Sequence, residues 1–112
     1  MSKTAFLPDC CDAALAETLR ADLFKALCDP VRISIVATLA ARKHAATVSE
    51  IAECCGVDFS GVSRHLKILK DANVLTATRE GRKVLYWLDT DMLAMTLRAM
   101  ADALQLCRAD AA

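Results

Sequence analysis

The sequence lacks the segments that direct a chain into or through a membrane. No stretch approaches the roughly 18 uninterrupted apolar residues that a membrane helix needs, and residues 1–10 have neither the basic start nor the long apolar run of a signal peptide. Glycines number only three, and we find no internal repeat and no low-complexity tract. We therefore expect a soluble, cytoplasmic protein without a membrane partner, folded as one domain over residues 1–112.

Net charge is also missing, because 14 basic residues balance 14 acidic ones. Any affinity for nucleic acid would then have to come from a local basic face of the protein. Cysteine, by contrast, is abundant, with six among 112 residues and two adjacent pairs. Because the signal peptide is missing and the helical patterns are long, we interpret the cysteines as reduced thiols available for metal or redox chemistry.

Apolar residues at helical spacing dominate both ends of the chain. Leucines four residues apart predict a helix over residues 12–27, and Asp29-Pro30 has the form of an N-cap and first residue for a helix over residues 31–42. The last predicted helix, residues 91–107, carries an apolar stripe wider than a one-sided surface helix needs. We expect this last helix to contact a partner subunit as well as its own core.

The middle of the chain, residues 48–71, has the pattern of a helix-turn-helix. Residues 47–50, with Thr first and Glu last, form a capping box for a short helix that Gly56 ends, and Asp58 caps the helix that follows. Residues 75–88 predict two short strands joined by a glycine-containing turn. We therefore predict a mainly α fold with a small β-hairpin, a winged helix-turn-helix.

The second helix of this predicted unit has a small, cationic outer face opposite its apolar residues. Small residues let the helix approach the floor of a DNA groove, an arginine can bind guanine or phosphate, and cations on the hairpin can reach the flanking backbone. The alternative is that these cations form the solvated face of an ordinary helical domain. Their position on a second helix and on the following hairpin favours DNA binding. The predicted DNA-binding residues are Ser60, Gly61, Ser63, Arg64, His65, Lys67, Arg79, Arg82 and Lys83.

Three further segments of the chain are LFKALCDPVR (residues 23–32), SRHLKILKDA (residues 63–72) and EGRKVLY (residues 80–86). Together they resemble the ArsR/SmtB family of metal-sensing winged-helix repressors. The resemblance covers residues 12–106 and implies a homodimer joined through the first and last helices, residues 12–27 and 91–107. It also implies that two recognition helices bind a palindromic operator in double-stranded DNA, which is released when an inducer binds.

The chain departs from two sensing sites typical of that family. Positions that match a Cys-x-Cys site hold Thr47, Ser49 and Ala52, and the last helix contains no histidine. Some arsenite sensors that the chain resembles instead carry an adjacent cysteine pair before the first helix, which Cys10-Cys11 matches. Those sensors take a further cysteine from a loop of the other subunit, where residues 42–44 are Arg, Lys and His.

The thiol chemistry favours a trivalent arsenic or antimony inducer, which takes about three thiolates, whereas mercury accepts about two or three and cadmium about four. Cys10 and Cys11 lie in the predicted flexible N-terminus, residues 1–11, close to a helix start that would lower their pKa. We predict that both are ligands. Cys54 is the preferred third ligand, with Cys55 second because it shares the apolar face of its helix. We expect no cofactor to be required for folding.

Several alternatives remain open. Cys10-Cys11 could be a spare pair, and the same cysteines could serve a thiol-redox or persulfide sensor, or a repressor that responds to mercury or cadmium. Cys28 is predicted to be a small buried residue between two helices, and Cys107 to be incidental. A constitutive DNA-binding protein is a further alternative. An enzyme is not expected, because a cysteine nucleophile needs a nearby base and the two histidines, His44 and His65, lie on a predicted loop and on the predicted DNA-binding face.

Overall fold

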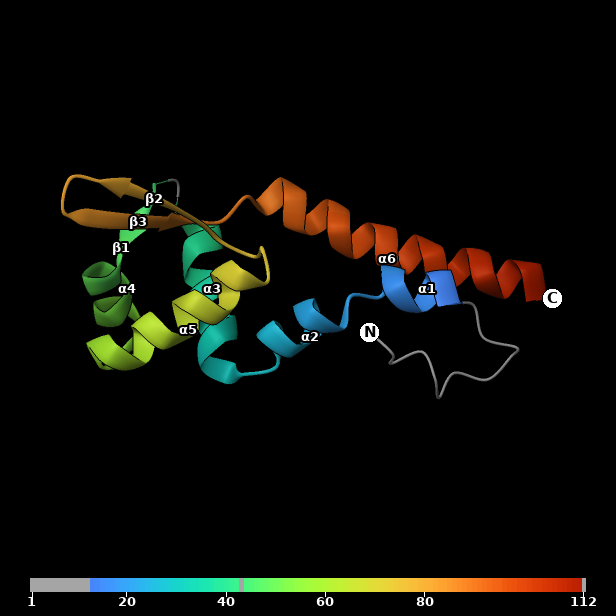
Figure 1. Ribbon diagram of the computed structural model, residues 1–112, viewed down its shortest axis with the longest axis horizontal. Coiled ribbons are helices and arrows are strands. Elements are labelled where there is room, and N and C mark those ends of the chain that lie inside the picture. The colour runs from blue at the N-terminus through green and yellow to red at the C-terminus, as the bar shows by residue number, and fades with distance from the viewer. Residues whose placement is uncertain (1–12, 43, 112) are drawn as a thin grey trace. The chain divides into compact units, whose positions relative to one another are not determined.

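The computed structural model describes residues 13–42 and 44–111, which form six helices and three strands in the described part of the chain (Figure 1). The predicted N-terminal segment, residues 1–11, lies outside the described residues. In chain order the elements are α1 (Ala13–Thr18), α2 (Ala21–Leu27), α3 (Pro30–Ala41), β1 (Ala46–Thr47), α4 (Val48–Cys55), α5 (Phe59–Asp71), β2 (Thr76–Glu80), β3 (Lys83–Trp87) and α6 (Thr90–Ala111).

The chain divides into two compact units. The expectation of a single domain stays a prediction. The central unit comprises Asp22–Thr90 and contains α2 to β3. The terminal unit contains α1 and residues 91–111 of α6. Each unit is described separately below.

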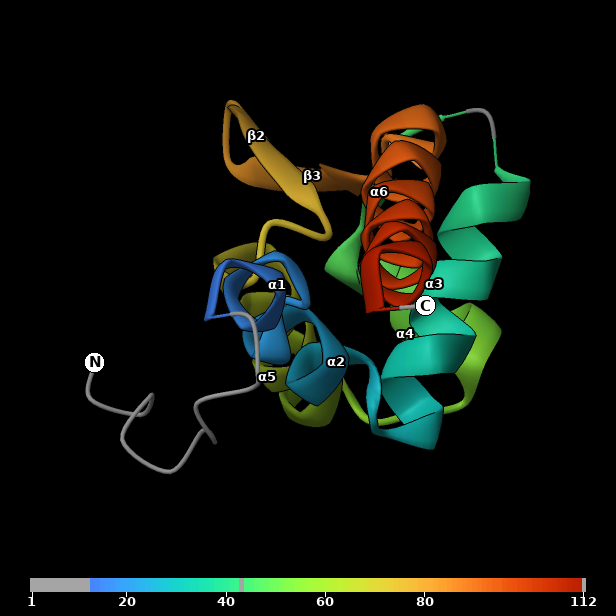
Figure 2. The same ribbon diagram turned by 90° about the vertical axis from the view of Figure 1, so that its right-hand side faces the viewer.

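The core of the central unit is built by α3, α4 and α5, which pack against one another, and by the sheet, whose strands β1 and β3 contact α4. Figures 1 and 2 show these helices gathered together, with the β2–β3 hairpin, the wing, projecting from them. Each fully buried leucine or isoleucine contributes about 1.5–3 kcal/mol to the folded state. The predicted inward face of α5 is confirmed. The largest fully buried side chains are Leu23, Ile35, Ile51, Leu66, Leu69 and Val62.

Side-chain caps begin the central helices where the sequence predicts them. Thr47 Oγ1 accepts from the Glu50 amide at 3.2 Å, and Glu50 accepts from the Thr47 amide at 2.9 Å, so the capping box of α4 is complete. Gly56 ends α4 in the left-handed conformation, with φ 66°. Asp29 and Asp58 cap α3 and α5 through their carboxylates. These caps fix the start of each helix and hence the direction in which its residues project.

The sheet has three antiparallel strands in the order β1-β3-β2, where only a hairpin was expected. In β1, Ala46 pairs with Tyr86 and Thr47 pairs with Leu85. A two-residue strand is too short to show alternation, so the sequence pattern gives no sign of it. The wing is confirmed within one or two residues of its predicted ends, and Gly81 begins its turn with φ 64°.

The predicted continuous helix over residues 12–27 is wrong. Helix α1 ends at Thr18 and α2 begins at Ala21, with a tight turn in which the Arg20 amide donates to the Thr18 carbonyl at 3.0 Å. No glycine or proline marks this break, and a four-residue leucine spacing fits two short helices as well as one long helix. As a result α2 belongs to the central unit, where Leu23 is buried.

The last helix, α6, has 22 residues and extends beyond its predicted end. Met100 is buried, whereas five other large apolar side chains are exposed. Among the described helices, none combines the length and apolar character required to cross a bilayer. The exposed residues are Met92, Met95, Leu97, Leu104 and Leu106.

Candidate nucleic-acid interface

The outer face of α5 presents two cations with different surroundings. Arg64 is exposed and makes no hydrogen bond or ion pair with any residue that the structure describes. Lys67 is also exposed, but its Nζ lies 3.0 Å from Oδ2 of Asp71 one turn later on the same helix. An exposed pair of this kind stabilises by only about 0.3–0.5 kcal/mol, so a phosphate can replace the aspartate. Arg64, like the exposed Lys70, is therefore an α5 cation without such a partner among the described residues, and it lies on the predicted outer face.

The first turn of α5 is held by Asp58. Its carboxylate accepts from the Ser60 hydroxyl at 2.7 Å and from the Gly61 amide at 3.2 Å. The Ser60 hydroxyl, followed by the Gly61 amide, keeps the pKa of Asp58 below its usual value. Ser60 is exposed as predicted and can still present its oxygen outward.

Gly61 does not lie on the outer face as expected, because it is buried. A Cβ at this position would lie 2.9 Å from Asp58 Oδ1 and 3.2 Å from Val57 Cγ1. The glycine therefore permits the close approach of the capping carboxylate. The position of Gly61 three residues after the N-cap Asp58 is the sequence signal for this role, whereas we predicted a contact with the DNA groove.

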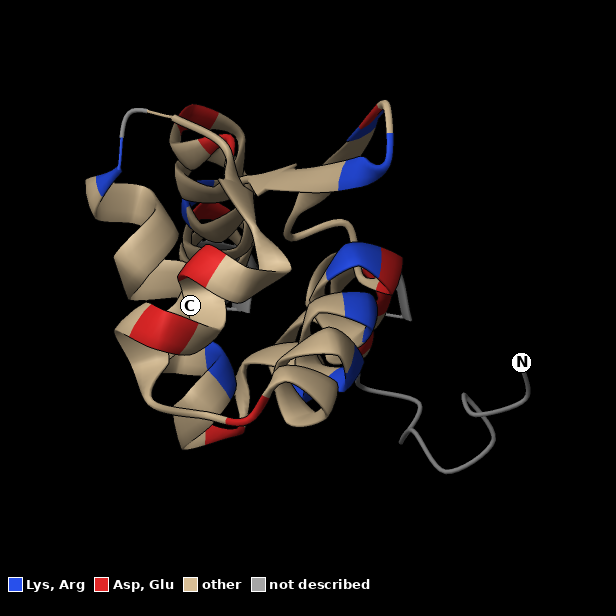
Figure 3. Cartoon of the chain, turned by 90° about the vertical axis from the view of Figure 1, so that its left-hand side faces the viewer, with Lys and Arg blue, Asp and Glu red and all other residues tan. Residues whose placement is uncertain are grey.

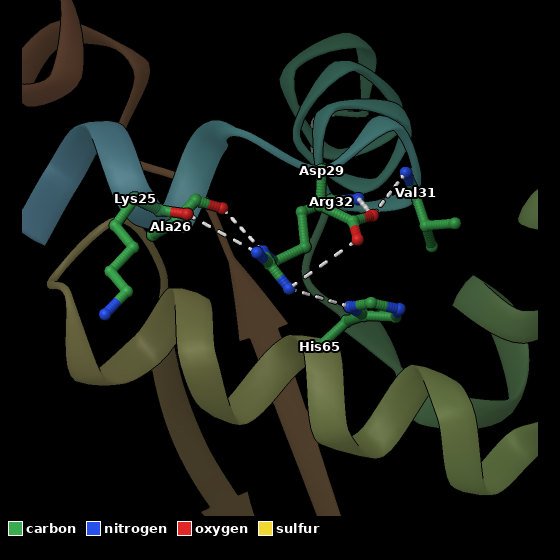
Figure 4. A network of polar contacts seen from close by, with 6 residues as sticks. All are labelled: Lys25, Ala26, Asp29, Val31, Arg32 and His65. Atoms are coloured by element: carbon green, nitrogen blue, oxygen red, sulfur yellow. Dashed lines mark hydrogen bonds and ion pairs between the residues drawn. The ribbon is translucent and has the colours of Figure 1, made fainter.

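His65 is half-buried and turned toward α3 (Figure 4). One terminal nitrogen of the Arg32 guanidinium lies 3.2 Å from His65 Nδ1. Because arginine can only donate, Nδ1 accepts and the proton of the neutral ring is on Nε2. His65 can thus donate to a phosphate only through Nε2. The predicted DNA contact of His65 stays a prediction, now limited to one atom.

Arg32 is a structural contributor to this interface that the sequence analysis did not single out. Its Nε donates to the Ala26 carbonyl at 2.6 Å and its other terminal nitrogen to the Lys25 carbonyl at 3.4 Å, so it caps the end of α2. It also lies 4.0 Å from Asp29, whose pKa is lowered first by the Val31 amide and further by Arg32. Arg32 therefore links the end of α2 and the start of α3 to the recognition helix.

The wing carries the remaining predicted cations. Arg79, Arg82 and Lys83 are all exposed, and Figure 3 shows basic segments on the wing and on α5 at the same side of the central unit. Ser63 is half-buried on α5. A positive face on a chain of zero net charge is what DNA binding requires of this sequence.

A groove of about 490 Å³ lies between the wing, the start of α4 and the start of α5. It contains an aromatic side chain that the sequence analysis missed, Phe59, which is 57% exposed. Its spacing from Val62 and Leu66 places it on the apolar side of α5, so the sequence predicts burial and gives no sign of its exposure. The groove is lined by Thr47, Val48, Ser49, Glu50, Phe59, Arg82, Lys83 and Val84.

The two cysteines of α4 face different surroundings. Cys54 is exposed, as expected. Cys55 is half-buried, and its Sγ lies 3.9 Å from both the Ser34 and the Thr38 hydroxyl oxygens of α3. The prediction that Cys28 is buried is wrong, because Cys28 is exposed at the end of α2, where Leu23 and Ala26 already fill the contact with the core.

The remaining predicted thiol ligands, Cys10 and Cys11, lie outside the described residues, as does the side chain of Cys107. Within the described part of the chain, no three His, Cys, Asp or Glu side chains come together as a metal site. Cys54 and Cys55 therefore do not provide a set of about three thiolates by themselves. The predicted metalloid site stays a prediction.

Comparisons with known proteins agree with this geometry. A model of a helix-turn-helix domain matches residues 27–77. The chain is 46% identical over 83 residues to the HTH-type transcriptional repressor SmtB of Mycobacterium tuberculosis, a match covering 73% of this chain and 60% of that protein. It is 34% identical over 79 residues to the transcriptional repressor SdpR of Bacillus subtilis, covering 70% of this chain and 86% of that protein.

A solved structure shows the same fold. It is the homodimeric winged helix-turn-helix DNA-binding domain of a possible ArsR-family transcriptional regulator from Mycobacterium bovis. The TM-score is 0.64 at 28% identity, and the match covers 81% of this chain and 82% of that chain. The chain spans about 60% of the length of the M. tuberculosis repressor. These relatives are transcriptional regulators, in agreement with the expectation of a protein that is not an enzyme. The predicted winged fold is confirmed, and the chain belongs to the ArsR/SmtB family of winged helix-turn-helix transcriptional repressors.

Proposed function

We propose that this protein is a repressor that binds double-stranded operator DNA as a homodimer. The observation that carries the proposal is Arg64, an exposed cation on the outer face of a helix whose other face is fully buried. A helix presented in this way enters the major groove, and an arginine there can bind both acceptors of a guanine. The wing cations then contact the flanking phosphates.

The dimer is supported by α6. Five large apolar side chains on this helix are exposed in one chain, and burying them against a second copy removes them from water. The Mycobacterium bovis domain of the same fold is homodimeric. A two-fold dimer would present two α5 helices to a palindromic operator, with half-sites about 34 Å apart.

DNA binding is tested by selecting duplexes from a random library with the reduced protein and measuring affinity by fluorescence anisotropy. We expect a palindromic consensus and an affinity that falls steeply with salt, because bound phosphates release counterions. Selection of no consensus, together with equal binding to scrambled duplexes, would contradict the proposal.

We further propose that a thiophilic signal releases the operator, with trivalent arsenic or antimony as the preferred inducer. The ligands would be Cys10 and Cys11 with a thiolate of α4. Exposure favours Cys54 for the third position, since the Cys55 sulfur lies against two hydroxyls of α3. Cys10 and Cys11 lie outside the described residues. An ion bound by them together with a thiolate of α4 would connect the N-terminus to the helix-turn-helix. A few kcal/mol of preference for a non-binding arrangement would empty the operator.

The inducer is tested by titrating the protein–operator complex with arsenite, antimonite, mercury, cadmium and zinc, and separately with a persulfide donor. We expect release by arsenite and antimonite, lost in Cys10→Ser and Cys11→Ser. Cys28→Ser is the matched control, because Cys28 is exposed like Cys54 but is not a proposed ligand, and its replacement should leave the response intact. Normal release from a Cys10→Ser/Cys11→Ser double variant would refute this inducer site, and release by the persulfide donor alone would favour redox sensing.

A further inference from the structure

Phe59 is an aromatic side chain without a core position. It begins α5 and is 57% exposed, whereas Val62 and Leu66 on the same helix are fully buried. An exposed phenyl ring contributes little to the stability of the unit, because its apolar surface stays in water. Its position at the start of the recognition helix is where residues contact base edges in helix-turn-helix complexes.

The groove around Phe59 combines apolar and cationic walls. Val48 and Val84 supply apolar surface, and Arg82 and Lys83 supply positive charge from the wing. A ligand with an anionic backbone and an apolar group would satisfy both walls. Double-stranded DNA has this composition, with its phosphates on the strand and the 5-methyl group of thymine in the major groove.

Charge separates the two parts of the groove. Asp58 immediately precedes Phe59, and its carboxylate stays ionised through the bonds from Ser60 and Gly61. Glu50 is the carboxylate that lines the groove, and it is paired at 3.9 Å with Arg42. Phosphates are therefore repelled from the start of α5 and attracted to the wing. An uncharged, apolar part of the DNA fits beside Phe59.

We infer that Phe59 contacts the 5-methyl group of a thymine in each operator half-site and so contributes to sequence preference. This inference rests on the DNA binding proposed above. Apolar contact with this methyl is an established way in which side chains distinguish thymine from the other bases. Phe59 thus acts by contact with a base, and Arg82 and Lys83 act by contact with the backbone.

The test uses the full-length protein and the duplex that it selects from a random library. Each thymine of a half-site is replaced in turn by deoxyuridine, which removes only the methyl group. We expect one such replacement to weaken wild-type binding about fourfold, the amount expected for one buried methyl. Phe59→Ala should bind the thymine and deoxyuridine duplexes equally.

Phe24→Ala is the matched control, because Phe24 is 50% exposed on α2 and lies outside this groove. It should retain the wild-type difference between thymine and deoxyuridine. The deoxyuridine scan of the wild type does not depend on whether any variant folds. Salt-sensitive binding to the selected duplex with no deoxyuridine effect at any thymine would overturn the inference and leave the proposed function standing. Failure to bind any duplex would overturn both.

Discussion

The central and terminal units differ in how far their large apolar side chains are buried within a single chain. In the central unit, the large apolar residues of α3, α4 and α5 meet one another and are buried, and each of these three helices has a side-chain cap. In α6, Met100 is buried but Leu97 and Leu104 are exposed on nearly the same side of the helix. The fold of the central unit is therefore determined by contacts within the unit. The terminal unit instead presents apolar surface that a second copy of the chain would cover in the proposed dimer.

The difference also separates two roles. A rigid central unit holds Arg64 and the wing in fixed positions, which sequence-specific recognition requires. In the proposed dimer, the exposed apolar helix α6 would set how two chains are joined and hence the spacing of their recognition helices. Substitutions in the core of the central unit should lower the free energy of unfolding of each chain. Substitutions in α6 should weaken dimerisation, so their effects should depend on protein concentration.

The largest effect is expected from the core of the central unit. Leu66→Ala removes a fully buried side chain and should lower the free energy of unfolding by about 2–5 kcal/mol. The control is Ile68→Ala on the same helix, because Ile68 is 40% exposed and should change stability much less. Urea unfolding followed by circular dichroism checks both, and equal losses would show that α5 is not oriented as described.

The next effect concerns α6. Leu97→Asp would place an unpaired charge in the proposed dimer contact and should weaken dimerisation on the order of 100-fold. Gln105→Glu is the control, since Gln105 shares the polar side of the helix with Arg98 and Asp102. Sedimentation at several concentrations measures the dissociation constants. A wild-type protein that is monomeric at high concentration and still binds a palindrome tightly would contradict the proposed dimer.

A smaller effect is expected at Arg32, whose side chain is 12% exposed. Arg32→Ala should cost about 1–3 kcal/mol, because two carbonyls of α2 and His65 Nδ1 lose their donor. Arg32→Lys should recover only part of this, since one ammonium cannot reproduce the planar set of donors. A Lys variant with full wild-type stability would show that the geometry of the guanidinium is unimportant.

The smallest effect is a dependence on pH. The pKa of Asp58 is lowered in the folded state, first by the Ser60 hydroxyl, and those of Asp29 and Glu50 are lowered by the amides of Val31 and Thr47. A lowered pKa stabilises the fold above the unfolded value of about 4, and this stabilisation is lost as the pH falls further.

We therefore expect the urea concentration at the midpoint of unfolding to decrease as the pH is lowered below about 4. Asp58→Asn should show a shallower loss, because asparagine caps a helix without titrating. The same slope in wild type and Asp58→Asn would exclude a contribution from this cap.

Much of this architecture could be predicted because it depends on local chemistry. The caps at Thr47 and Asp58 and the buried face of α5 follow from spacing within one helix. The pairing of β1 with β3 and the contact between Arg32 and His65 join residues far apart in the chain, and no local pattern reveals them. The break between α1 and α2 was missed because the leucine spacing continues through it.

The candidate site was predicted less completely for the same reason. The cationic residues of α5 and the wing were identified from their positions in the helix-turn-helix pattern. The burial of Gly61 and the exposure of Phe59 and Cys28 depend on how neighbouring elements fill space. Composition alone favours burial of phenylalanine and cysteine, and the packed structure decides each case.

One comparison of affinities tests whether α5 contacts bases while the wing contacts the DNA backbone. Wild type, Arg64→Ala and Arg82→Ala are each titrated with the selected operator and with a scrambled duplex at the same salt concentration. Arg64→Ala should lose about 1–3 kcal/mol on the operator and much less on the scrambled duplex, whereas Arg82→Ala should weaken both alike. Unchanged operator affinity in both variants would contradict the proposal that α5 and the wing bind DNA.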